Sequence, residues 1–221
     1  MQKKSKKNII TIIIATACQF VILFGISLFN QNLLMTFPIH VRMIFMFLCQ
    51  WVLLPVPVLL MLKEKEKLRD IGFEREKLFF QIIIGLSIAT VMCLVLTVIP
   101  ILCGFKDIVS STRYSQPWQF VFRFFYTIFG VALVEEFFFR GYLFRKLLDI
   151  KNSKLFAISI SSVIFGLFHI LAGGFIQVLI TGIIGAIYCF CKEKIKNCTL
   201  LSLIIAHGVY DALIVLCVSL M

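Results

Sequence analysis

Charged residues are scarce in this chain of 221 residues, and acidic residues are the scarcest of them. Asp and Glu number 11 against 22 Lys and Arg, whereas hydrophobic residues make up 61% of the chain and the mean hydropathy is +1.02. In an average soluble domain only about half of the residues are apolar. The shortage of charge therefore excludes an ordinary soluble domain and predicts a protein that crosses a membrane several times.

Long polar stretches, internal repeats and low-complexity segments are also absent from the sequence. Because one crossing needs about 20 residues, the length accommodates a single helical bundle without a second, soluble domain. We expect an all-α transmembrane bundle of about seven spans, one integrated domain with an N-terminal part (residues 1–117) and a core (residues 118–221). The expected spans are Ile9–Phe29, Val41–Leu62, Leu78–Cys103, Trp118–Phe144, Leu155–Ala172, Phe175–Cys191 and Cys198–Met221.

The positive charge is concentrated in four segments, which hold 17 of the 22 Lys and Arg residues. They are Lys3–Lys7, Lys63–Lys77, Arg145–Lys154 and Lys192–Lys196. Cytoplasmic loops collect Lys and Arg, and seven spans with a cytoplasmic N-terminus place all four segments inside. Topology thus accounts for the net charge of +11 without nucleic acid. The richness in Ile, Lys and Phe favours the cytoplasmic membrane of a bacterium.

Ionisable residues within the apolar stretches are few, and one cluster of them lies in the fourth expected span. Placing such a group in hydrocarbon costs about 2.5–3.5 kcal/mol on insertion scales, so the cluster indicates a functional site. Glu136 and Arg140 are four residues apart and can pair on one helix face. Glu135 points about 100° away from Glu136 and stays available for chemistry.

Two further pairs have the same four-residue spacing: His207 with Asp211, which is a second polar pair, and Phe165 with His169. The helical rise of about 1.5 Å per residue puts Glu135, His169 and His207 at similar depths, roughly 14 to 21 Å from the cytoplasmic helix ends. A carboxylate beside a histidine in an apolar cavity can deprotonate a water molecule, and a second polar pair can stabilise an oxyanion. The pattern predicts a peptide hydrolase with Glu135 as the base.

These three motifs resemble, in order and spacing, those of the CAAX protease and bacteriocin-processing (CPBP or Abi) family of intramembrane proteases, which includes type II CAAX prenyl endopeptidases. The motifs are Glu135-Glu136-x-x-x-Arg140, Phe165-x-x-x-His169 and His207-x-x-x-Asp211, and the resemblance covers roughly Trp118 to Leu216. It implies a glutamate-dependent peptidase that opens to the cytoplasmic side.

The resemblance also implies roles for the individual residues. Glu135 and His169 would hold the catalytic water, and Glu136 with Arg140 would fix the geometry. His207 and Asp211 would line the oxyanion site. Family members often carry Asn at the last motif position, whereas Asp211 donates a hydrogen bond only when protonated and otherwise orients His207.

Two alternatives stay open at this point. Glu135, His169 and His207 also form a possible zinc set, although the chain has no His-Glu-x-x-His helix, so we expect no cofactor and keep zinc as the alternative. The expected partner besides lipid is a membrane-associated protein or peptide precursor, such as a prenylated C-terminus, a bacteriocin or a pheromone. The rival function is a non-catalytic immunity or scaffold protein that modulates a sensor or transporter and keeps the polar core for helix packing.

Overall fold

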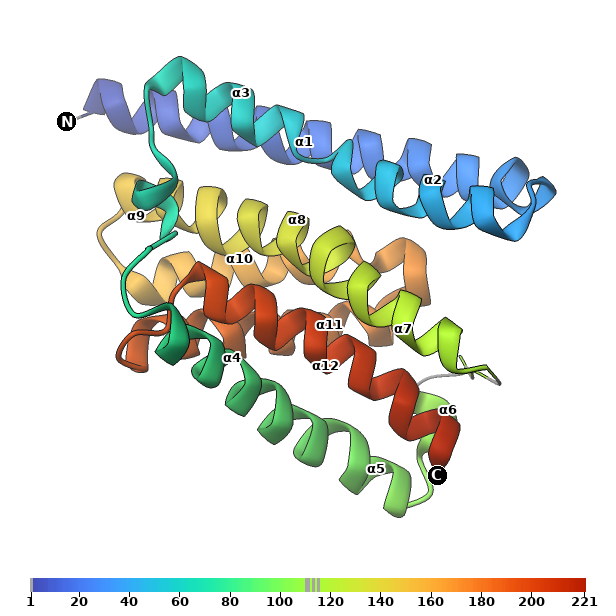
Figure 1. Cartoon of the computed structure of the whole chain (residues 1–221). Helices are drawn as coiled ribbons and strands as arrows, with labels where there is room; N and C mark the ends of the chain where they lie inside the picture. Colours follow the sequence, from blue (N-terminus) through green and yellow to red (C-terminus); the bar gives the residue numbers. More distant parts are fainter. Residues whose placement is uncertain (1, 110–111, 113, 115) are drawn as a thin grey trace. The chain divides into compact units, whose positions relative to one another are not determined.

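The computed structural model describes residues 2–109, 112, 114 and 116–221, and the regular structure within these residues is entirely helical (Figure 1). Five of the described helices are long and apolar enough to cross a membrane, and a sixth, Lys154–Phe168, is apolar but shorter. The five are Lys6–Thr36, Ile39–Glu64, Leu78–Leu102, Ile170–Lys194 and Leu200–Leu220. The expected polytopic all-α bundle is confirmed, whereas the number of spans and their orientation stay predictions.

The helices follow the expected spans closely. They are α1 (Gln2–Asn32), η1 (Leu34–Thr36), α2 (Ile39–Trp51), α3 (Pro55–Glu64), η2 (Leu68–Ile71), α4 (Leu78–Cys93), η3 (Leu94–Val98), α5 (Ile99–Leu102), α6 (Lys106–Val109), α7 (Pro117–Phe125), η4 (Tyr126–Ala132), α8 (Leu133–Glu136), η5 (Phe137–Leu143), α9 (Phe144–Ile150), α10 (Lys154–Phe168), α11 (Ile170–Lys194) and α12 (Leu200–Leu220). Non-helical dihedral angles at Gly173 and Gly174 interrupt α11 between the fifth and sixth expected spans, and a further break lies within the fifth, because α10 ends at Phe168.

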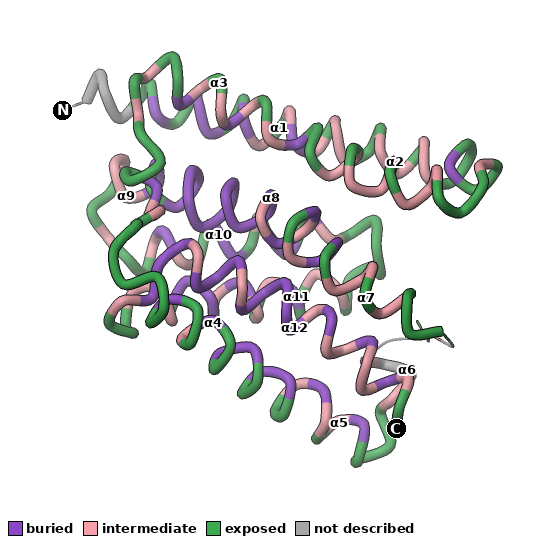
Figure 2. Tube along the Cα trace, in the orientation of Figure 1, coloured by how far each residue is buried: buried purple, intermediate pink, exposed green. Residues whose placement is uncertain are grey.

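The contacts along the chain divide it into two compact units, which we describe separately. Unit 1 consists of Met1–Phe73 and Val134–Ile195, and unit 2 consists of Glu74–Leu133 and Lys196–Met221. In unit 1 the buried positions concentrate in η5, every residue of which is buried, and along α10 (Figure 2). The expected division into residues 1–117 and 118–221 does not coincide with these two units, and it stays a prediction.

A polar contact explains how unit 1 tolerates a break between α2 and α3. Pro57 has no N–H, so the carbonyl of Leu53 lacks its helical donor four residues on. The side chain of Gln19 in α1, which is only 1% exposed, supplies the missing donor, with its Nε2 2.7 Å from Leu53 O. Unsatisfied backbone groups are costly in a membrane, so Gln19 makes the break at Pro57 compatible with a bilayer.

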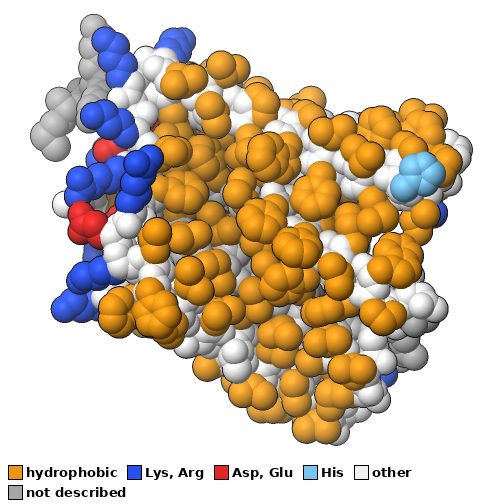
Figure 3. All heavy atoms as spheres, viewed as in Figure 1, with side chains coloured by type: hydrophobic (Ala, Val, Ile, Leu, Met, Phe, Trp, Pro, Cys, Tyr) orange, Lys and Arg blue, Asp and Glu red, His pale blue; other side chains and the backbone are white. Residues whose placement is uncertain are grey.

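Ion pairs connect all four Lys-rich segments of the sequence. Glu64 binds both Lys7, at 3.1 Å, and Lys146, while Lys154 binds Glu193 at 2.6 Å. Lys and Arg side chains gather at the end of α1 and α3 where Lys7 and Glu64 lie (Figure 3). Hydrophobic side chains cover most of the rest of these two helices in this view. The segments therefore lie together, as a common cytoplasmic location requires.

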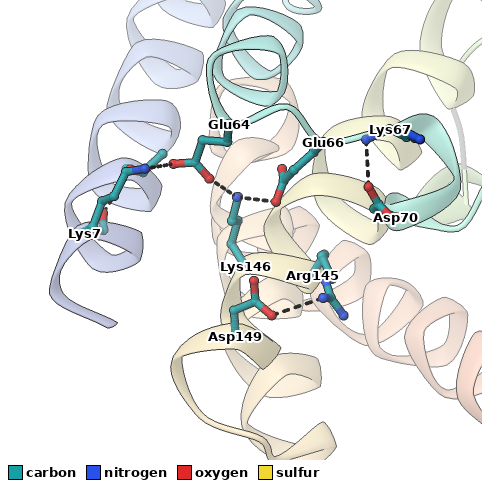
Figure 4. A network of polar contacts seen from close by, with 9 residues as sticks. Lys7, Glu64, Glu66, Lys67, Asp70, Arg145, Lys146 and Asp149 are labelled. Atoms are coloured by element: carbon teal, nitrogen blue, oxygen red, sulfur yellow. Dashed lines mark hydrogen bonds and ion pairs between the residues drawn. The ribbon is translucent and has the colours of Figure 1, made fainter. Parts of the chain in front are cut away.

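Lys146 is the centre of this polar network (Figure 4). It is 1% exposed and donates hydrogen bonds to the carboxylates of Glu64 and Glu66, the latter at 2.6 Å. Burial alone lowers the pKa of the Lys146 ammonium, but the two carboxylates outweigh burial and the net pKa is raised. Lys146 thus stays charged and holds the start of the linker that follows α3 against α9.

Small residues allow close helix packing in both units. In unit 1, a Cβ on Gly166 of α10 would lie 2.5 Å from Val178 O of α11. In unit 2, a Cβ on Gly85 would lie 2.6 Å from Ser202 O, and one on Gly208 would lie 2.6 Å from Ile128 Cα. Backbones in contact of this kind are typical of helices that associate in membranes.

Replacement of Gln19 tests whether the break between α2 and α3 depends on its hydrogen bond. Gln19→Leu leaves the carbonyl of Leu53 without this donor in apolar surroundings, so we expect a loss of about 1–3 kcal/mol of stability. Thermal unfolding in detergent micelles measures it as a lowered midpoint. The matched control is Gln31→Leu in the exposed end of α1, where the amide contacts only Ser27. Equal midpoints for the two variants would contradict the role given to Gln19.

Candidate active site

Glu136 and Arg140 form the ion pair that their spacing predicts. Arg140 Nη1 lies 2.9 Å from Glu136 Oε1, and both side chains are fully buried. An ion pair with no exposure to solvent has a large desolvation cost, which its Coulomb attraction offsets only when the geometry is good. The pair is therefore a fixed point in unit 1 rather than a mobile surface contact.

The helix that carries this pair is irregular on both sides of it. Tyr126–Ala132 and Phe137–Leu143 are π-helical, and only the four residues Leu133–Glu136 between them are α-helical. π-Helical turns are rare and occur mostly at functional sites. Uniform steps of about 100° per residue do not predict these turns, because hydrophobic periodicity does not distinguish a wide turn within a fully buried stretch.

Glu135 faces His169, as the sequence analysis expected. Glu135 Oε2 lies 3.8 Å from His169 Nε2, and Glu135 is 6% exposed. His169 is placed just beyond the end of α10, where its φ of −94° and ψ of 5° end the helix, and not within a continuous helix as expected. His169 is therefore the one residue between α10 and α11 along the chain.

A second contact determines the tautomer of His169. Its Nδ1 lies 2.9 Å from the carbonyl oxygen of Phe165. Because a carbonyl oxygen only accepts hydrogen bonds, Nδ1 must carry the proton. In the neutral ring Nε2 is then an acceptor, and it is directed at the carboxylate of Glu135.

The side chain of Phe165 connects the two motifs. The guanidinium carbon of Arg140 lies 4.0 Å from the centre of the Phe165 ring, and the rings of Phe165 and His169 are 4.8 Å apart in an edge-to-face arrangement. Contacts therefore run from Glu136 through Arg140, Phe165 and His169 to Glu135, the neighbour of Glu136 in sequence. We call these five residues the contact ring.

His207 and Asp211 belong to unit 2 and form their own pair on α12. His207 Nε2 lies 3.5 Å from Asp211 Oδ2, and His207 is 5% exposed. Asp211 is half-buried, and Gly208 next to His207 packs against Ile128. Each expected pair is thus present within its unit. That the pairs of the two units serve one reaction stays a prediction.

Metal binding by these residues gains no geometric support. Within the described part of the chain, no three His, Cys, Asp or Glu side chains group closely enough to hold a metal ion. The zinc set of Glu135, His169 and His207 stays a sequence-based alternative.

A comparison with known families identifies the class. Residues 117–213 match the family described as type II CAAX prenyl endopeptidase Rce1-like, so the expected resemblance to the CAAX protease family is confirmed over this part of the chain. The family, together with the apolar helices, makes this chain an integral membrane protein and supports protease function in general. Comparison with curated proteins and with solved structures gives no significant match.

Helix α11 contacts the contact ring at Arg140, which the three sequence motifs do not predict. Lys192 Nζ donates a hydrogen bond to the carbonyl oxygen of Arg140, and the Tyr188 ring centre lies 5.5 Å from its guanidinium carbon. Lys192 was assigned to a Lys-rich cytoplasmic segment by charge alone. The helical spacing of Gly185, Tyr188 and Lys192 was the signal available in the sequence.

The buried ion pair predicts a strongly non-additive response to substitution. Arg140→Met leaves the Glu136 carboxylate buried without its cation, so we expect a loss of about 3–5 kcal/mol of stability. The double variant Glu136→Gln, Arg140→Met removes both charges and should recover most of this loss. Unfolding midpoints in micelles for both single variants and the double variant measure the coupling. Additive losses would show that the pair does not act as a unit.

Proposed function

We propose that this chain is an intramembrane endopeptidase that hydrolyses a peptide bond with a water molecule activated by Glu135 and His169. The observation that supports the proposal most is the approach of Oε2 of the buried Glu135 to His169 Nε2 at 3.8 Å. With Nδ1 protonated, both of these atoms are acceptors when Glu135 is ionised. Two acceptors at this separation suit one water molecule that donates a hydrogen bond of about 2.8 Å to each.

Such a water molecule is well oriented for nucleophilic attack. Its two hydrogens are directed to Glu135 and His169, so its lone pairs are directed to the opposite side, where the scissile carbonyl carbon would lie. As the C–O bond forms, the proton passes to Glu135 and the carbonyl becomes an oxyanion. When the C–N bond breaks, the protonated Glu135 donates that proton to the leaving amine. Both products are released and the carboxylate is regenerated.

The rest of the contact ring would keep the two acceptors in place. Arg140 neutralises Glu136, so the adjacent Glu135 is not exposed to a second uncompensated carboxylate. Phe165 holds His169 twice, through its carbonyl and through its ring. Misplacement of a catalytic group by about 1 Å can cost a hundredfold in rate, so this support is functionally important.

We assign the oxyanion to His207 on the resemblance of the third motif. In unit 2 its Nε2 faces Asp211, and an ionised Asp211 would accept the Nε2 hydrogen. Asp211 would then orient the ring rather than donate to the oxyanion as an Asn does, and the donor to the oxyanion would be the Nδ1–H of a His207 imidazolium, which carries a hydrogen on both nitrogens. Further, we propose a bacterial cytoplasmic membrane, cleavage near its cytoplasmic face, and a membrane-associated peptide or protein precursor as substrate.

Glu135→Gln is the decisive variant for this proposal. The amide keeps the shape of the side chain but cannot accept the proton of the water, so we expect cleavage to fall by about 10²–10⁴-fold. A quenched fluorescent peptide with a farnesylated CAAX terminus measures cleavage in vitro, and peptidomic comparison of membranes reports on native substrates.

A matched control is Glu193→Gln. This substitution removes the ion pair of Glu193 with the exposed Lys154, which lies outside the contact ring. It should leave cleavage unchanged. If the Glu135→Gln protein, present at native levels, left both the peptide assay and the membrane peptidome unaltered, the catalytic proposal would be wrong. Immunity or signalling that survived in the same cells would then favour the non-catalytic scaffold.

A chelator separates direct activation by Glu135 from the zinc alternative. We expect cleavage of the farnesylated peptide to survive dialysis against a strong zinc chelator, because Glu135 and His169 suffice to hold the water. Loss of cleavage that added zinc restores would overturn the metal-free mechanism. The unfolding midpoint is followed in parallel, so that loss of fold is not mistaken for loss of metal.

A further inference from the structure

Helix α11 carries none of the residues assigned to the chemical step, yet one face of it packs against Arg140. Gly185, Tyr188 and Lys192 are three and four residues apart, so they follow each other along this face. Each lies beside a different part of Arg140: Tyr188 beside its guanidinium, Lys192 beside its backbone oxygen, and Gly185 where an added Cβ would meet its terminal nitrogen. The side chain and the backbone of Arg140 are thus held by the same helix.

Gly185 is the point of closest approach. A Cβ at this position would lie 2.9 Å from Phe165 Cδ1, closer than packed atoms allow, and 3.0 Å from Arg140 Nη2, which is tighter than most packed contacts. Phe165 is 2% exposed and Arg140 is fully buried, so neither has room to move away. Any side chain here would therefore push apart the stacked pair that supports His169.

Lys192 holds the other end of Arg140. Its Nζ donates to the backbone oxygen of Arg140, within the π-helical stretch Phe137–Leu143, and lies 5.5 Å from the centre of the Phe144 ring. A carbonyl oxygen has two lone pairs, so it can accept this hydrogen bond beside a helical one. A charged donor makes the contact stronger than a neutral one.

We propose that α11 is the positioning helix of the site, and that Gly185 and Lys192 are positioning residues that fix Arg140 and, through Phe165, His169. The inference deepens the proposed function and rests on it. Neither residue touches the reacting atoms in this account. Their substitution should therefore slow turnover without weakening the binding of substrate.

Lys192 is tested with the full chain in micelles and the farnesylated CAAX peptide as the probe. Lys192→Met keeps the length of the side chain and removes the donor, so we expect kcat to fall on the order of tenfold with KM within about twofold. Lys192→Arg, which can donate to the same carbonyl, should restore most of kcat. The matched control is Lys194→Met, an exposed lysine on the same helix, which should match the native chain.

Gly185 is tested by a pair of alanine variants one helical turn apart. Gly185→Ala forces the contacts described above and should lower kcat in the same way. In Gly182→Ala the new Cβ would lie 3.5 Å from Ser162 O, an ordinary contact, so turnover should be unchanged. The ¹⁵N chemical shifts of the His169 ring supply a second measurement. They should change in Gly185→Ala and Lys192→Met and remain as in the native chain in the controls Gly182→Ala and Lys194→Met.

The outcomes separate this inference from the proposed function. If Glu135→Gln abolishes cleavage while Lys192→Met and Gly185→Ala behave like their controls in kcat and in the His169 signals, the positioning role is wrong and the mechanism stands. Loss of kcat in Lys192→Met that Lys192→Arg fails to restore also contradicts it. If Glu135→Gln retains full cleavage, the mechanism is wrong, and movement of the His169 signals alone still decides whether α11 positions the ring.

Discussion

A buried ion pair, Glu136 with Arg140, is the constraint on which the rest of unit 1 depends. A guanidinium and a carboxylate placed away from water are tolerable only if each is held in good geometry. The Phe165 ring under the guanidinium, at 4.0 Å, contributes a cation–π contact worth about 2 kcal/mol in such surroundings. The need to enclose Arg140 therefore draws η5, α10 and α11 together.

The backbone near the ion pair is irregular. The π-helical stretches on both sides of Leu133–Glu136 alter the direction of successive side chains, and the early end of α10 at Phe168 frees His169 from helical geometry. Irregular backbone is expensive in a membrane unless its polar groups are satisfied within the protein. Hydrogen bonds from Lys192 to Arg140 and between His169 and Phe165 supply such partners at the points of irregularity.

Much of this architecture could be predicted from the sequence, because it follows from local rules. Apolar runs gave the helices to within a few residues, and the four-residue spacings gave the pairs Glu136–Arg140 and His207–Asp211. The shared location of the Lys-rich segments followed from the rule on cytoplasmic charge. Tertiary contacts without a spacing signature were out of reach: the hydrogen bond from Gln19 to Leu53, the π-helical turns and the part played by Lys192. The tautomer of His169 also depends on a backbone carbonyl that no sequence pattern marks.

The most direct test of the account is the protonation state of His169 in lipid bilayers near neutral pH. Solid-state ¹⁵N NMR distinguishes a protonated ring nitrogen from a bare one, and the chain has only three histidines, so substitution of His40 and His207 isolates the signal. The account predicts a neutral ring with the proton on Nδ1 and a bare Nε2 that faces Glu135. A proton on Nε2, in either the other tautomer or the imidazolium, would contradict the two-acceptor site for the water molecule.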